Sequence, residues 1–139
     1  MKYFLLLTVL FCACGGIGAT NNMFTDIKEI EQRSGMNFGD GAKVLFQEDN
    51  LGGDQEAQSW LIFMKSRSEF PKGKLEPQTA NDAQEYFERF QRLASEDIGT
   101  LRSEQTTTAF WESPDGRYDA AVIETDKGFI MELQWVKQN

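Results

Sequence analysis

Hydrophobic positions recur along the chain with two different periods, and each period predicts one kind of element. Near residue 23, apolar side chains recur at spacings of three and four, as on one face of a helix. The same spacing returns between about Asp82 and Asp97, where charged side chains occupy the other face. We therefore expect two amphipathic helices. Their inward-facing positions are Met23, Phe24, Ile27 and Ile30 in the first, and Ala83, Phe87, Phe90 and Ala94 in the second.

Segments that alternate between apolar and polar positions predict five strands. Two of them, at 43–47 and 59–64, are joined by a polar, glycine-rich connection, and Val44 and Phe46 are expected to share a face. The other three follow the second helix and are separated by glycine-containing turns. In the last strand every second residue from Phe129 to Trp135 is apolar, which predicts one buried and one partly wet sheet face. These three strands are expected at 106–112, 117–125 and 128–137.

The elements combine into one α+β domain over residues 22–139. We expect a sheet of about five antiparallel strands with both helices packed on its single apolar face, in the order αββ-αβββ. This order is similar to that of several small periplasmic inhibitor and assembly-factor domains. The likeness is one of architecture, and architecture does not fix function.

The N-terminus follows a different pattern, which predicts export. Lys2 is the only charge before Asp26, and an unbroken apolar run fills positions 3–13. The run is shorter than the ~20 residues that a membrane-spanning helix needs, but it fits the core of a secretory signal. Cleavage after Ala19 would leave about 120 residues as an exported, soluble protein in the periplasm or outside the cell.

A second cleavage site competes with the first. Phe11-Cys12-Ala13-Cys14 resembles the lipobox of bacterial lipoproteins, in which the last Cys is lipidated and becomes the first residue. Ala13 and Cys14 match that pattern, whereas Phe11 departs from the usual Leu or Val. The resemblance covers only about the first 20 residues. It implies that a lipid on Cys14 anchors the protein, for example to the outer membrane, and that the membrane is a partner only through this anchor.

Composition narrows the possible functions. The chain has 14 Lys and Arg against 22 Asp and Glu, a net charge of −8, which disfavours nucleic acid and anionic lipid as partners. It contains no His, and both Cys lie in the signal region. The domain therefore lacks the residues of Ser-His-Asp and Cys-His nucleophilic sites and of His- or Cys-bound metals, and we expect no cofactor.

The remaining chemistry points to binding. Phe110 and Trp111 are adjacent in a strand and must face opposite ways, so Trp111, with Arg117 and Tyr118, is a candidate protein-binding set on an open sheet face. Lys72 and Lys74 are interpreted as solubilising charges. The connection between the first two strands offers a weak cation site, formed by Asp49, Asp54 and Glu56.

The hypothesis that fits best is a small acidic envelope protein that binds another protein without catalysis, as immunity proteins, inhibitors and assembly factors do. A module that binds a small ligand or a cation is the alternative. A carboxylate-dependent hydrolase ranks third, because two suitably spaced carboxylates would suffice and 22 acidic residues make such a pair unspecific.

Overall fold

The computed structural model describes residues 24–67, 69–102 and 109–138. The export signal, both cleavage sites and Cys14 lie outside these residues. The elements are α3 (Ile27–Ser34), β1 (Lys43–Asn50), β2 (Ala57–Met64), β3 (Lys74–Pro77), α4 (Ala80–Leu93), β4 (Ala109–Glu112), β5 (Tyr118–Thr125) and β6 (Gly128–Val136).

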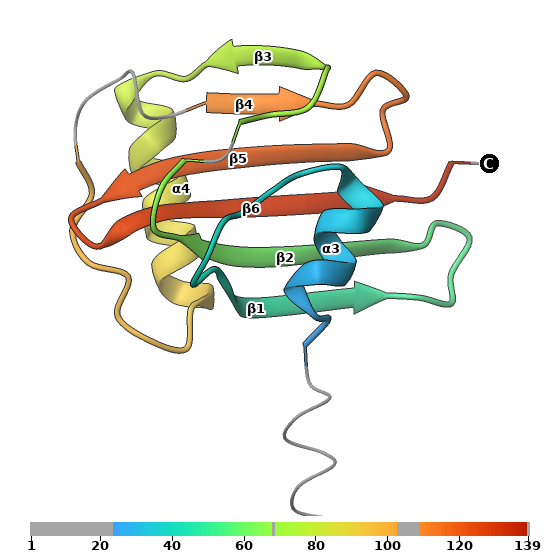
Figure 1. Ribbon diagram of the computed structural model, residues 1–139, viewed down its shortest axis with the longest axis horizontal. Helices are drawn as coiled ribbons and strands as arrows, with labels where there is room; N and C mark the ends of the chain where they lie inside the picture. Colours follow the sequence, from blue (N-terminus) through green and yellow to red (C-terminus); the bar gives the residue numbers. More distant parts are fainter. Residues whose placement is uncertain (1–23, 68, 103–108, 139) are drawn as a thin grey trace, which may run out of the picture.

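The strands form one sheet of six strands, in the order β1-β2-β6-β5-β4-β3, and all neighbours are antiparallel (Figure 1). The prediction of an α+β fold with an antiparallel sheet is confirmed. The strand count is six rather than about five because β3 also joins the sheet, pairing Lys74 with Glu112 and Pro77 with Ala109. β3 is short and ends in Pro77, which suits the edge of a sheet because proline offers no N–H to a further strand.

The two helices lie on opposite faces of the sheet, so the prediction that both pack on one face is wrong. In Figure 1, α3 crosses in front of the sheet and α4 lies behind it. The physical reason is that the central strands are apolar on both sides. In β2, Trp60 and Ile62 belong to the core under α3, whereas Leu61 between them belongs to the core under α4.

Each face therefore has its own hydrophobic core. The α3 face is the larger and contains two fully buried tryptophans. The core of the α3 face includes Ile30, Met36, Phe38, Trp60, Ile62, Met64, Trp111, Val122, Met131 and Leu133. The core of the α4 face includes Leu45, Leu61, Phe90, Ile98, Ala121, Ile123 and Ile130.

Local signals explain where the helices begin and end. At α3, the Asp26 carboxylate accepts a hydrogen bond from the Lys28 N–H, and Gly35 ends the helix with φ 78°. At α4, Thr79 and Asp82 form a reciprocal capping box, so the helix begins at Ala80. It ends at Leu93, earlier than expected, because Ala94 is already extended. Within the described ranges, no helix is long and apolar enough to cross a membrane.

A strap, residues 69–73, runs over the α3 face toward β3. The Trp111 indole N–H donates a hydrogen bond to the Pro71 carbonyl at 3.1 Å, and the Phe70 ring stacks on Trp111 with centroids 5.8 Å apart. Gly73 passes so close to the sheet that a Cβ there would collide with the Glu112 carbonyl and the Trp111 ring. The strap is thus held against the sheet by one buried indole.

Candidate functional site

The candidate binding set Trp111, Arg117 and Tyr118 is only partly brought together. Trp111 is 1% exposed in the core of the α3 face, so it is not the exposed anchor that we expected. Tyr118 is half-buried on the same face, because Trp111 pairs with Ala120 and Tyr118 stands two residues before Ala120 in β5. Arg117 is exposed at the β4–β5 turn, with its guanidinium 3.7 Å from Asp115.

Two adjoining hollows on the α3 face contain Trp111 at their shared floor. The first, of about 310 Å³, lies between the end of α3, the strap and the β4–β5 turn, and it includes Tyr118. The second, of about 530 Å³, lies between the strap and β3. Both are lined by Pro71, Lys72 and Trp111, so they form one continuous depression. We call this depression the trough and define it by Arg33, Phe70, Lys72, Leu75, Trp111 and Tyr118.

The apolar part of the trough is exposed to solvent at the edge of the sheet. Leu75 of β3 is 50% exposed and lies opposite Trp111 in the β3–β4 register. Phe70 is half-buried beside it, and the Arg67 guanidinium lies 5.6 Å from the Phe70 ring centroid. A large aliphatic side chain next to a stacked aromatic pair forms an apolar surface, and its exposure to water is unfavourable.

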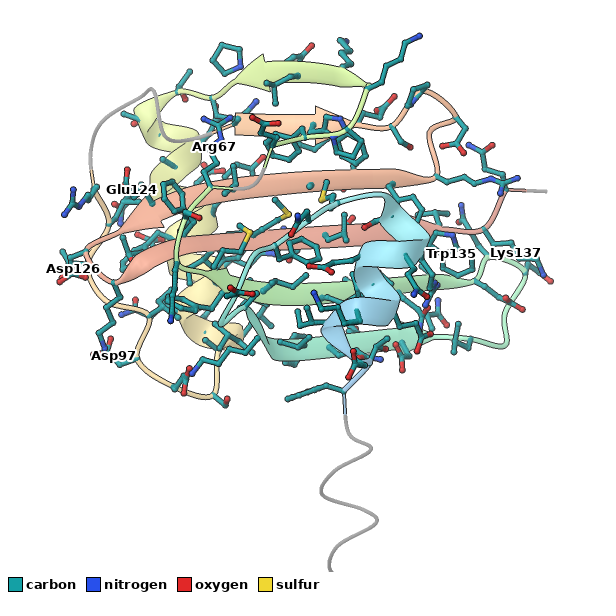
Figure 2. The ribbon with its side chains drawn as sticks, in the orientation of Figure 1. Arg67, Asp97, Glu124, Asp126, Trp135 and Lys137 are labelled. Atoms are coloured by element: carbon teal, nitrogen blue, oxygen red, sulfur yellow. The ribbon has the colours of Figure 1, made fainter. Side chains whose placement is uncertain are left out.

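Three cations line the trough: Arg33, Arg67 and Lys72. The Arg33 guanidinium lies 5.2 Å from the Trp60 ring centroid and 5.4 Å from that of Trp135, and it donates to the Gln58 side-chain oxygen at 2.8 Å. Figure 2 labels Trp135 at this end of the sheet. Lys72 is exposed and makes no hydrogen bond or ion pair with any residue in the described part of the chain. Its ammonium group is therefore available to an incoming anion.

Three acidic residues lie close to these cations. The Glu29 carboxylate is 3.8 Å from the Arg33 guanidinium, and Glu69 and Asp115 line the two hollows. Asp115 accepts hydrogen bonds from the Arg117 backbone N–H and from the Ser113 hydroxyl, and these bonds lower the pKa of its carboxyl group, the backbone bond most. The lining of the trough thus has three cations, Arg33, Arg67 and Lys72, against two carboxylates, Glu69 and Asp115. It carries a small positive charge on a chain whose net charge is −8.

On the α4 face, acidic side chains gather next to the hydrophobic core. Glu112 of β4 lies directly opposite Asp119 of β5, and Glu132 of β6 is buried beside them. We call these three residues the acidic strip. Burial, followed by the charges of Glu132 and Glu112, raises the pKa of Asp119. Arg89 of α4 forms a close ion pair with Glu132, which also accepts a hydrogen bond from Gln134 at 2.9 Å.

The structure does not bring Asp49, Asp54 and Glu56 together as a cation site. The Asp49 carboxylate accepts hydrogen bonds from the Gln47 and Gln58 side-chain amides, and Glu56 lies 3.6 Å from the Lys137 ammonium group. Among the residues that the structure describes, no three acidic side chains are grouped so that they could hold a metal ion. Only Asp49 lies in β1, whereas Asp54 and Glu56 lie in the connection between β1 and β2.

The sequence did not reveal the trough as a site. Lys72 was interpreted as a solubilising charge, and Arg33, Phe70 and Leu75 were not singled out. The available signal was local: an aromatic residue and a proline precede a basic pair within the short segment 70–74. Nothing in that segment indicated which tryptophan the strap would cover. Comparison of the chain with protein-family models, with curated proteins and with solved structures finds no match.

Proposed function

We propose that this protein acts without catalysis, as a cell-envelope protein that binds another protein at the trough. The observation that carries the proposal is the half-exposed Leu75 beside the Phe70–Trp111 stack, with the free ammonium group of Lys72 next to it. Aromatic side chains and arginine are enriched at protein interfaces, and the trough contains Phe70, Tyr118 and Arg33. The hollows, of about 530 and 310 Å³, fall within the range of about 300–1,000 Å³ that is typical of ligand pockets.

The trough is also preorganised, which favours binding. The hydrogen bond from Trp111 to Pro71 and the close approach of Gly73 hold the strap in place before any partner arrives. A surface that is already ordered loses less conformational entropy on association than a loop that must be fixed. A rigid apolar hollow supports recognition of a partner side chain.

Binding is favoured over catalysis by the side chains that the chain has. It contains no His, and its two Cys are at positions 12 and 14. The trough offers cations, hydroxyls and aromatic rings, and its carboxylates are Glu69 and Asp115. Asp115 accepts two hydrogen bonds that lower the pKa of its carboxyl group, which makes it a weaker general base. These side chains are better suited to binding a ligand than to catalysing its reaction.

Export and lipidation are part of the same proposal. The apolar N-terminal run supports export, and the likeness of 11–14 to a lipobox supports lipidation at Cys14. The intact mass of the mature protein from a bacterial host tests both. A chain that begins at a diacylated Cys14 supports the lipoprotein, a chain that begins at Thr20 supports soluble export, and an uncleaved chain overturns export.

The binding proposal is tested by comparing two exposed leucines. Leu75 is 50% and Leu51 56% exposed, and only Leu75 belongs to the trough. Envelope proteins that cross-link to the immobilised wild type should also cross-link to Leu51→Ser, and should be at least tenfold less abundant with Leu75→Ser. Equal melting temperatures of the three proteins exclude misfolding. A partner recovered equally by all three would overturn the proposal, as would a stabilising small molecule with no protein partner.

A further inference from the structure

Resting on the proposed function, we infer that the trough binds an extended peptide segment of its partner in which a large apolar residue is followed directly by an acidic one. The apolar side chain enters the hollow between the strap and β3, and the carboxylate meets Lys72. The inference goes beyond the proposed function because it specifies the chemistry of the partner.

The apolar requirement follows from the wider hollow. Phe70, Leu75 and the Trp111 ring line about 530 Å³ that opens to solvent at the sheet edge. Filling it with a leucine, isoleucine or phenylalanine would remove apolar surface from water on both sides, which favours binding. A polar side chain there would lose hydrogen bonds to water and gain none from Phe70 or Leu75.

The acidic requirement follows from charge. Lys72 lines both hollows, and no described residue pairs with it. Arg33, at the far hollow, already has Glu29 at 3.8 Å. Cations still outnumber carboxylates on the lining, with Arg33, Arg67 and Lys72 against Glu69 and Asp115. Because Lys72 borders the apolar hollow, the partner's carboxylate must adjoin its apolar residue.

An extended conformation follows from the position of β3. It is the last strand in the sheet order, so one side of its backbone pairs with β4 and the other has no strand beside it in the described part of the chain. A peptide lying along this edge can use those backbone groups while its side chains reach the trough. Pro77 limits such pairing to the first residues of β3, which are the ones nearest the strap.

The experiment uses three labelled ten-residue peptides and fluorescence anisotropy on the purified full-length protein. The first peptide carries two leucine–aspartate pairs, the second replaces both aspartates by asparagine, and the third replaces both leucines by serine. We expect the first to bind at least fivefold more tightly than the second and at least tenfold more tightly than the third. The preference for aspartate should shrink as salt rises, because the Lys72 ammonium group is exposed.

Variants of the protein test separately the preference for aspartate and the contribution of the apolar hollow. Lys72→Gln should abolish the preference for aspartate over asparagine, and Leu75→Ser should weaken both peptides alike. Arg92→Gln, a cation on α4 away from the trough, is the matched control and should behave as the wild type. In a nitrogen-15 spectrum the Trp111 indole resonance should shift with the first peptide.

The outcomes separate this inference from the proposed function. Equal affinity for the aspartate and asparagine peptides, or a Lys72→Gln variant that keeps the preference, overturns the inference. If no peptide binds while a partner is still captured through Leu75, the inference fails and the proposed function stands. If neither peptides nor Leu75-dependent capture is seen, both fail.

Discussion

The two faces of the sheet are stabilised and exposed in different ways. The α3 face is closed by large aromatic side chains, and the strap is held against it by Trp111. The α4 face is apolar only under its helix, and beyond that it carries the acidic strip, in which Glu112 and Asp119 lie opposite each other. Figure 2 labels Asp97 and Asp126 at one end of the sheet and Trp135 and Lys137 at the other.

Large buried side chains dominate the α3 face, whereas interacting charges dominate the acidic strip on the α4 face. Changes on the α3 face should alter stability through volume and should depend little on pH. Changes in the acidic strip should alter stability through electrostatics and should depend on pH. Four substitutions test this separation, and they are ordered by the size of the expected effect.

Trp111→Ala should give the largest loss. It empties the space of a buried indole, breaks its hydrogen bond to Pro71 and removes the ring on which Phe70 stacks. Removal of a buried aromatic side chain costs about 3–5 kcal/mol. Urea denaturation at pH 5 and pH 7 should give the same loss. The control Phe24→Ala, at a position 39% exposed, should cost much less. A loss below about 1 kcal/mol would show that the indole is not the support of this face.

Gly73→Ala should destabilise the same face by overpacking. Its Cβ would collide with the Glu112 carbonyl and the Trp111 ring, so the strap would have to move. Such crowding costs about 1–3 kcal/mol. Gly53→Ala is the control, because the nearest atom to its Cβ would be 3.9 Å away. If thermal denaturation shows equal stability for the two variants, the strap is not tightly held.

Arg89→Met addresses the charge on the α4 face. It leaves the buried Glu132 carboxylate with Gln134 as its remaining donor, which should cost about 1–2 kcal/mol. Adding Glu132→Gln should recover most of the loss, because the uncompensated charge is gone. Denaturation of both single variants and the double variant measures the coupling. Additive losses would mean that the ion pair contributes nothing of its own.

Asp119→Asn should have the smallest effect, and it should stabilise. Like charges directly opposite in a sheet are destabilising by roughly 0.2–1 kcal/mol, and this change removes one of them. Because the pKa of Asp119 is raised in the folded state, its contribution to stability falls as pH rises through that pKa. The gain from asparagine should therefore be present at pH 7 and vanish below the ordinary pKa of 3.8.

Asp97→Asn is a control that should change stability in the direction opposite to Asp119→Asn. Its carboxyl pKa is lowered, first by the hydrogen bond from the Gly99 N–H and then by Lys127. The carboxylate therefore stabilises the fold above its ordinary pKa, and this stabilisation is lost in acid. Melting temperatures at pH 7 should fall for Asp97→Asn and rise for Asp119→Asn. The same sign for both would contradict the electrostatic account of the acidic strip.

The sequence predicted the elements better than their arrangement. Helix spacing and strand alternation located both helices and most strands, because these periods reflect local burial. The two-sided core was missed although β2 reads Trp60-Leu61-Ile62, a continuous apolar run that is typical of a strand covered on both faces. In β1 a bulge between Val44 and Phe46 sends these residues to opposite faces, and no local signal marked it.

The candidate site was less predictable, because it depends on contacts between distant segments. Trp111 was recognised as one of an inside–outside pair with Phe110, but alternation alone cannot say which one is buried. The strap decides it, and the strap is 40 residues away from Trp111 along the chain. Lys72 becomes a candidate binding residue only because this contact places it on the lining of both hollows.

The position of β6 has a consequence for how the chain folds. This strand is the last in sequence, yet it lies between β2 and β5 and is bonded to both. The sheet therefore consists of two separate parts, β1-β2 and β5-β4-β3, until β6 is present. A nascent chain cannot join β2 to β5 before β6 has been made, and such long-range pairing folds slowly.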